Sequence, residues 1–161
     1  MRDKRRWIYM LLPFATAIAF LVGAVVLKNM YGFDYSNLLG FKAVLGSVVG
    51  FVSIVIGFYS AFYGMIISMS RSTFFLSLKH SRFKKDLPRI LLYSLLSAFM
   101  TLILTIALQI LVNYKSILGE TVYFVWVFMT GVFMTYALQT SILSIAIVFF
   151  GNSDQIEVKK I

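Results

Sequence analysis

The sequence has no cysteine and only one histidine among its 161 residues. The lack of cysteine excludes disulfides, thiolate catalysis and cysteine-based metal sites, and His80 could not form a metal site alone. Six acidic residues are spread along the chain and form no pair suited to acid and base catalysis. The sequence also has no phosphate-binding glycine loop, no HExxH motif and no nucleophile elbow. We therefore expect a protein that is not an enzyme and that uses no metal or cofactor.

Charge of either sign is scarce, at 13% of residues, while 60% are hydrophobic. Soluble domains are about 25% charged and about 45–50% apolar. Uncharged runs occupy residues 7–27, 43–70, 90–113 and 121–150. Each exceeds the roughly 18 residues that indicate a membrane helix, and none alternates as barrel strands do. We predict an all-α integral membrane protein, with residues 1–161 as one domain of four transmembrane helices and an uncleaved first span.

Lysine and arginine are distributed unevenly between the two sides that these spans would define. Twelve lie in residues 1–6, in the segment 71–89 or after residue 150, and the remaining three are Lys28, Lys42 and Lys115. Cytoplasmic loops of membrane proteins carry the excess of positive charge. We therefore expect a multi-pass protein with both termini and the middle segment in the cytoplasm.

Small residues recur every three or four positions in the second run, in the stretch LGSVVGFVSIVIGFYSAFYGMIISMS. Helices in lipid associate by close packing, which small residues permit, because the bilayer is as apolar as a leucine side chain. The spacing predicts one helix-packing seam of Gly46, Gly50, Ser53, Gly57, Ser60, Gly64 and Ser68. The first run offers a partner face of Ala15, Ala19 and Gly23. The partner helix belongs either to the same chain or to another copy, and we expect a homo-oligomer.

Polar residues also occur inside the third and fourth runs, notably Thr101, Thr105, Thr135 and Gln139. One interpretation is a weakly polar pore or a hydrogen-bonded interior. The other is that Ser and Thr bond to the carbonyl four residues back in their own helix. No acidic or basic side chain lies within the four runs, which argues against an ion-coupled transporter.

The middle segment carries six basic residues, Arg71, Lys79, Arg82, Lys84, Lys85 and Arg89. Three interpretations remain open. The segment could contact anionic membrane lipids, dock a cytoplasmic effector protein, or bind nucleic acid with Phe74, Phe75 and Phe83 stacking on bases. We expect the first two, which are compatible with each other, rather than direct nucleic-acid binding.

The order of these features resembles small four-span proteins of bacterial anti-phage defence. The stretch LGSVVGFVSIVIGFYSAFYGMIISMSRS followed by RFKK invites comparison with the membrane component of the lambda Rex exclusion system and with the membrane subunit of the Kiwa system. The first resemblance implies a channel that depolarises the membrane, and a holin-like pore has similar composition. The second implies a homo-oligomeric sensor coupled to a cytoplasmic effector. Both imply a bacterial inner membrane, and neither carries a functional residue over to this chain.

Overall fold

The computed structural model describes residues 2–32, 34–68, 87–114 and 116–150. Over these residues the elements are α1 (Arg2–Tyr31), the short 3-10 helix η1 (Tyr35–Asn37), α2 (Phe41–Ser68), α4 (Leu87–Leu111) and α5 (Ile117–Phe150). Each long helix contains a stretch that is long and apolar enough to cross a membrane, namely Leu11–Tyr31, Phe41–Gly64, Arg89–Leu111 and Ile117–Ile142. The prediction of an all-helical fold with four such helices is confirmed.

The connection from α1 to α2 depends on two glycines. Gly32 follows α1 with a φ of 61°, and Gly40 precedes α2 with a φ of 90°. Both values lie in the left-handed region, which residues with a Cβ rarely adopt. Between them, the Asp34 carboxylate accepts a hydrogen bond of 3.0 Å from the backbone N–H of Ser36 and caps η1. These local features turn the chain at the end of the bundle where α1 stops.

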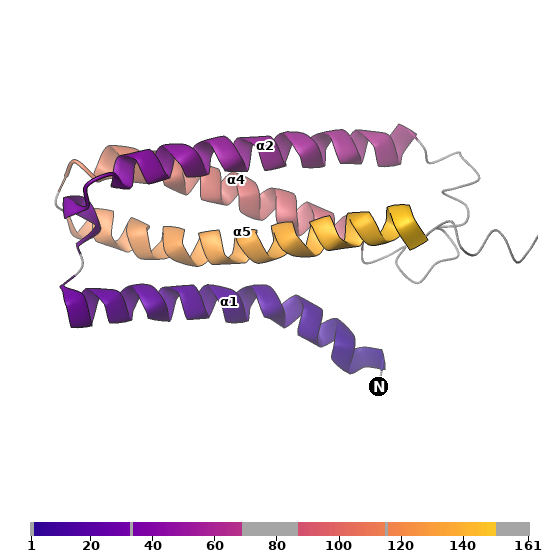
Figure 1. Ribbon diagram of the computed structural model, residues 1–161, viewed down its shortest axis with the longest axis horizontal. Helices are drawn as coiled ribbons and strands as arrows, with labels where there is room; N and C mark the ends of the chain where they lie inside the picture. Colours follow the sequence, from indigo (N-terminus) through magenta and orange to yellow (C-terminus); the bar gives the residue numbers. More distant parts are fainter. Residues whose placement is uncertain (1, 33, 69–86, 115, 151–161) are drawn as a thin grey trace, which may run out of the picture.

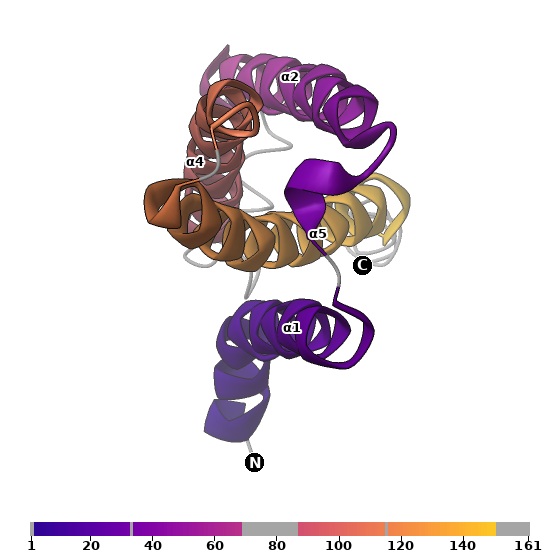
Figure 2. The same ribbon diagram turned by 90° about the vertical axis from the view of Figure 1, so that its left-hand side faces the viewer.

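The four helices follow one another in space in the order α2, α4, α5, α1, as Figures 1 and 2 show. α4 packs between α2 and α5, and α1 packs on α5. In the most apolar stretch of each helix, 33% of residues are buried in α4 and α5, against 11% in α1 and α2. α4 and α5 therefore form the centre of the fold, and α1 and α2 each leave a broad face uncovered.

The buried side chains form two clusters along the helices. The larger lies near the end where η1 is found and includes Leu45, Leu108 and Trp126. The second joins Val52 of α2, Ala98 of α4 and Phe133 of α5. These clusters join α2, α4 and α5, and Ala24 of α1 is part of the larger one.

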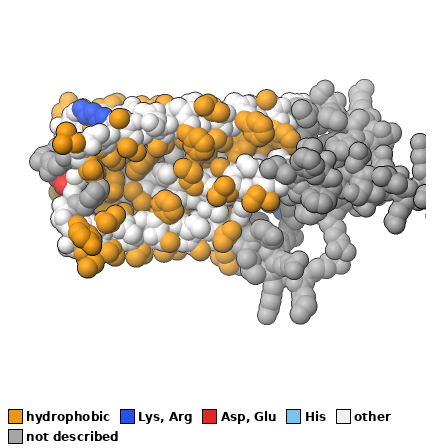
Figure 3. All heavy atoms as spheres, in the orientation of Figure 1, with side chains coloured by type: hydrophobic (Ala, Val, Ile, Leu, Met, Phe, Trp, Pro, Cys, Tyr) orange, Lys and Arg blue, Asp and Glu red, His pale blue; other side chains and the backbone are white. Residues whose placement is uncertain are grey.

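The surface of the bundle is apolar over the length of the helices. Figure 3 shows hydrophobic side chains across the visible face and charged side chains at the end where α1 stops and α5 begins. Ile54, Leu96, Ile103 and Leu138 are among the large side chains that are more than half exposed. Such a continuous apolar surface is far larger than the patches of soluble monomers and requires lipid or protein against it.

Candidate functional site

The small residues of α2 lie on the outside of the chain. Gly46, Gly50, Ser53, Gly57, Ser60 and Gly64 are all exposed. A Cβ built at any of the four glycines would meet no other atom within 4 Å. Ser68 is the last residue of α2, and its side chain is outside the described set. We call the six described residues the small-residue face of α2.

α2 packs on the rest of the chain through a different face. Leu45, Val52 and Tyr59 recur every seven residues and are 1% exposed or less. At about 100° per residue, this buried stripe lies roughly a third of a turn from the small-residue face. Within one chain the small-residue face does not pair with Ala15, Ala19 and Gly23, because α1 packs on α5 and those three residues are exposed.

A close approach of two helices involves a glycine that the sequence pattern did not single out. A Cβ at Gly131 of α5 would lie 2.8 Å from the Cα of Ala17 in α1. One helical turn further along α5, the hydroxyls of Thr16 and Thr135 share a hydrogen bond of 2.5 Å. Small residues therefore do allow backbones to touch in this protein, but between α1 and α5.

The threonines of the third and fourth spans hold helices together. Thr101 and Thr105 are fully buried, and Thr135 is 8% exposed. Thr105 donates to the carbonyl of Thr101 at 2.6 Å and accepts the indole N–H of Trp126 at 2.8 Å. Thr101 donates to the carbonyl of Met129 at 3.3 Å, and Thr135 donates to that of Gly131 at 3.0 Å. Thr105 and Thr135 thus bond to the carbonyl four residues back in their own helix, while the bonds of Thr101 with Met129 and of Thr105 with Trp126 connect α4 to α5.

Other polar side chains of α4 and α5 are arranged differently. Gln139 is half-buried and does take part in an interaction. Four hydroxyls of the described residues are buried without a hydrogen-bond partner in the protein, those of Ser94, Thr130, Thr140 and Ser144. A hydroxyl buried in an apolar environment without a partner is unfavourable by a few kcal/mol.

The predicted basic segment falls almost entirely outside the described residues. Arg71, Lys79, Arg82, Lys84 and Lys85 lie in the range 69–86, which the structure does not describe. Arg89 is described, in the first turn of α4, and is exposed.

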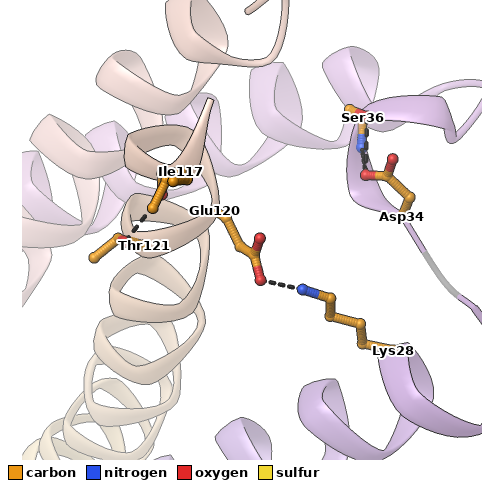
Figure 4. A network of polar contacts seen from close by, with 6 residues as sticks. All are labelled: Lys28, Asp34, Ser36, Ile117, Glu120 and Thr121. Carbon is orange, nitrogen blue, oxygen red and sulfur yellow. Dashed lines mark hydrogen bonds and ion pairs between the residues drawn. The ribbon is translucent and has the colours of Figure 1, made fainter. Parts of the chain in front are cut away.

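A cavity of about 420 Å³ opens at the end of the bundle where η1 lies, and we call it the end cavity. Its walls come from the end of α1, the η1 connection and the start of α5, namely Ala24, Lys28, Gly32, Asp34, Tyr35, Ser36, Ser116, Ile117, Glu120, Tyr123 and Phe124. Figure 4 shows Lys28 extending from α1 to the Glu120 carboxylate on α5, where the two form an ion pair. In the described parts of the chain, no three His, Cys, Asp or Glu side chains group as a metal site would require.

Aromatic rings form one side of the end cavity. The rings of Tyr35 and Tyr123 stack with centroids 4.6 Å apart and an interplanar angle of 8°. Phe41 of α2 lies 5.8 Å from Tyr35 and 6.1 Å from Trp126, so the aromatic contacts continue from the cavity into the larger core cluster. A Cβ built at Gly119 would lie 2.9 Å from the Tyr35 hydroxyl oxygen, which is closer than side chains normally approach. The position of Tyr35 thus depends on a glycine at the start of α5.

The pKa of Tyr35 reflects both its burial and the charged groups around its hydroxyl. Burial is the main cause that raises the pKa of Tyr35 above its usual value of 10.0. The nearby carboxylates of Asp34 and Glu120 raise it further, and the Lys28 ammonium lowers it. The three charges of the cavity therefore act on one point at its aromatic wall.

The sequence contained two signals for the end cavity. Lys28 lies in the last turn of α1 and Glu120 in the first turn of α5, where each charge is favoured by the helix dipole. The tyrosines at 35 and 123 are residue types typical of a membrane interface. Neither signal shows that the two helix ends are adjacent, because that depends on α1 packing against α5.

Searches with this chain find no match among protein-family models, curated proteins or solved structures. The class of this protein is therefore inferred from the fold alone. Four apolar helices of spanning length, packed through buried threonines and small residues, are the arrangement of a multi-pass membrane protein.

Proposed function

We propose that this chain is a non-enzymatic membrane subunit of a bacterial anti-phage defence complex. In this proposal it self-associates through the small-residue face of α2 and binds a cytoplasmic effector protein through residues 71–89. The observation that carries the proposal is the position of that face. Four glycines with no atom within 4 Å of a built Cβ lie along the outside of the chain.

Glycine in a helix exposed to lipid has no evident benefit, because it lowers helix propensity by about 1 kcal/mol relative to alanine. At a helix contact the same glycine lets two backbones approach closely, and the small-xxx-small spacing is typical of such contacts. Gly46 and Gly50 have this spacing, and Gly57 and Gly64 follow at intervals of seven residues, or two helical turns, on the same side. A second helix packed against this face would explain why glycines occur there, whereas contact with lipid would not.

A second copy of the chain is the partner that we propose for this face. Copies inserted in one membrane share their orientation, so two α2 helices would run parallel about a two-fold axis along the membrane normal. Each residue near the axis would then contact its own counterpart, with Gly50 and Ser53 near the middle of the contact.

The remaining parts of the proposal rest on the sequence. The excess of Lys and Arg supports a cytoplasmic location for both termini and for residues 71–89 in a bacterial inner membrane. Six basic residues in that segment suit an effector with an acidic surface, or anionic lipid. The order of features along the chain resembles that of four-span anti-phage defence subunits, and this resemblance supports a role in phage defence.

The test replaces Gly50 and Gly57 together with leucine and measures the particle mass in detergent by light scattering. We expect the native chain to be an oligomer and the variant to have a smaller mass, because two leucine side chains would hold the helices apart. The control, Ile54→Phe, adds bulk to a lipid-facing side chain of α2 and should leave the mass unchanged. A native particle that contains one chain, or a variant that keeps the native mass, would refute self-association through this face.

The absence of cysteine allows a second measurement of the same contact. A disulfide requires Cα atoms no more than about 7 Å apart. In native membranes, Ser53→Cys should therefore form a dimer on mild oxidation, while Ile54→Cys should remain a monomer. If Gly23→Leu in α1 also lowers the particle mass, the small-residue face of α2 contacts α1 of the neighbouring copy rather than its α2.

A passive ion channel is the second candidate function. Buried hydroxyls without a protein partner on α4 and α5, at Ser94, Thr140 and Ser144, favour it, because a hydrated path along these helices would satisfy them. Ion flux from liposomes that contain the purified chain separates this candidate from the first. Sealed vesicles would exclude it.

A further inference from the structure

The end cavity combines charged and apolar walls in a fixed order along the bundle axis. Lys28 and Glu120 line it one helical turn further out than Ala24 and Phe124. One turn is about 5.4 Å along each helix. Because α1 and α5 run in opposite directions, both helices place their apolar residue toward the middle of the bundle.

This order follows that of a bilayer, where head groups lie outside the hydrocarbon. The membrane-spanning stretches of α1 and α5 end at Tyr31 and begin at Ile117, so the cavity lies at the level where they meet the interface. Its volume of about 420 Å³ is within the range of about 300–1,000 Å³ that small-molecule sites occupy. A ligand that fits the walls has a polar end directed outward and an apolar end directed inward.

The charges of the cavity specify the polar end of that ligand. Lys28 has three N–H donors, of which the ion pair with Glu120 uses one. The Lys28 ammonium also lies 5.7 Å from the centre of the Phe124 ring. A phosphate would find hydrogen-bond donors there.

The cavity also has negative charge that a cationic group would face. The Asp34 and Glu120 carboxylates line the same cavity, and both act on the Tyr35 hydroxyl. The rings of Tyr35 and Tyr123 also line the cavity, and aromatic rings attract ammonium groups. Among the described residues, one positive and two negative side chains line the cavity, and this set is complementary to a ligand that carries both a phosphate and an ammonium.

We propose that the end cavity binds the head group of a zwitterionic phospholipid, with Lys28 on the phosphate and the carboxylates of Asp34 and Glu120 around the ammonium. The acyl chains leave past Ala24 and Phe124 along the apolar surface of the bundle. The proposal depends on the chain being embedded in lipid, and it does not depend on self-association or on a defence partner.

The test uses the full chain with Trp7→Phe, which leaves Trp126 as the single tryptophan. Trp126 lies 6.2 Å from Tyr123 of the cavity wall, so its fluorescence should respond when the cavity fills. Phosphatidylethanolamine is titrated into dodecyl maltoside micelles that contain the protein. We expect a saturable change, and phosphatidylglycerol, which has no ammonium, should require at least about fivefold more lipid for half-saturation.

Two variants test whether the change in Trp126 fluorescence comes from lipid bound in the end cavity. Lys28→Met should raise the half-saturating amount of phosphatidylethanolamine by about tenfold or more, because it removes the charge-assisted hydrogen bond to the phosphate. Lys42→Met is the matched control, since Lys42 lies at the same end of the bundle but bonds to Asn113 at 2.6 Å and does not line the cavity. It should bind the lipid as the parent does, and both variants should retain the parent's helical circular dichroism.

Soluble phosphoethanolamine distinguishes the lipid from its free head group. It should bind at least tenfold more weakly, because it cannot use the apolar wall. Equal binding of the free head group would replace the lipid with a soluble ligand and refute the proposal. So would a response without saturation, an equal response to phosphatidylglycerol, or unchanged binding in Lys28→Met.

Discussion

The contact between Gly131 and Ala17 allows a sharp test of how α1 is held to the bundle. In Gly131→Ala, the new methyl group would lie 2.8 Å from the Cα and 3.4 Å from the backbone nitrogen of Ala17. Carbon atoms in contact prefer about 3.5–4.0 Å, so the two helices must separate by about 1 Å. The hydrogen bond between Thr16 and Thr135 lies beside this contact and would lengthen with it.

The size of the effect follows from two opposing contributions. Overpacking of a close contact is destabilising by about 1–3 kcal/mol. Replacing glycine by alanine in a helix is favourable by about 1 kcal/mol. Gly23→Ala on α1 is the matched control, because a Cβ at Gly23 meets nothing within 4 Å and the variant has only the favourable contribution. The difference between the two variants is therefore the contact itself, about 1–3 kcal/mol in favour of Gly23→Ala.

The assay is thermal unfolding in detergent, followed by circular dichroism. For a chain of this size, 1 kcal/mol shifts the midpoint by about 2–4 °C, so Gly131→Ala should unfold roughly 2–12 °C below Gly23→Ala. Adding Ala17→Gly should not restore the midpoint, because the shortest contact is with the Cα of residue 17 rather than its methyl group. Equal midpoints for Gly131→Ala and Gly23→Ala, or full rescue by Ala17→Gly, would refute a direct backbone contact of α1 with α5.

Two further predictions concern the aromatic side chains. Trp126→Phe removes the indole donor to Thr105 and should lower stability by about 1–2 kcal/mol in thermal unfolding; no change would show that this bond contributes nothing. Tyr35 has a raised pKa in the folded chain, so the unfolded chain loses that proton first and stability should fall as the pH rises past about 10. In Tyr35→Phe the midpoint should fall less between about pH 9 and pH 11, and an identical fall in both proteins would contradict the assignment.

Composition was sufficient to predict the secondary structure. Each of the runs 7–27 and 121–150 lies within one helix, α1 and α5. In lipid a backbone must satisfy its hydrogen bonds within its own segment, so a long uncharged run has few alternatives to a helix. The bonds of Thr105 and Thr135 to carbonyls four residues back follow from the same helix geometry, and they agree with the local interpretation of the sequence.

The pairing of the helices could not be predicted in this way. The small-residue spacing puts six described residues on one side of α2, but the same spacing cannot show what lies against that side. Gly131, which meets the backbone of another helix, is not part of a run of glycines in α5 like the one in α2. Its role depends on the position of Ala17, more than a hundred residues away in the sequence.

The amino-acid sequence by itself determined that this chain forms four apolar helices, because hydrophobicity and the demands of backbone hydrogen bonding are properties of each segment alone. Only the tertiary structure decided the order α2, α4, α5, α1, which leaves the glycines of α2 on the outside. It also brought Lys28, Asp34 and Glu120 around one cavity. Contacts between segments depend on the fit of two surfaces at once, and in lipid no difference in hydrophobicity selects one apolar face over another.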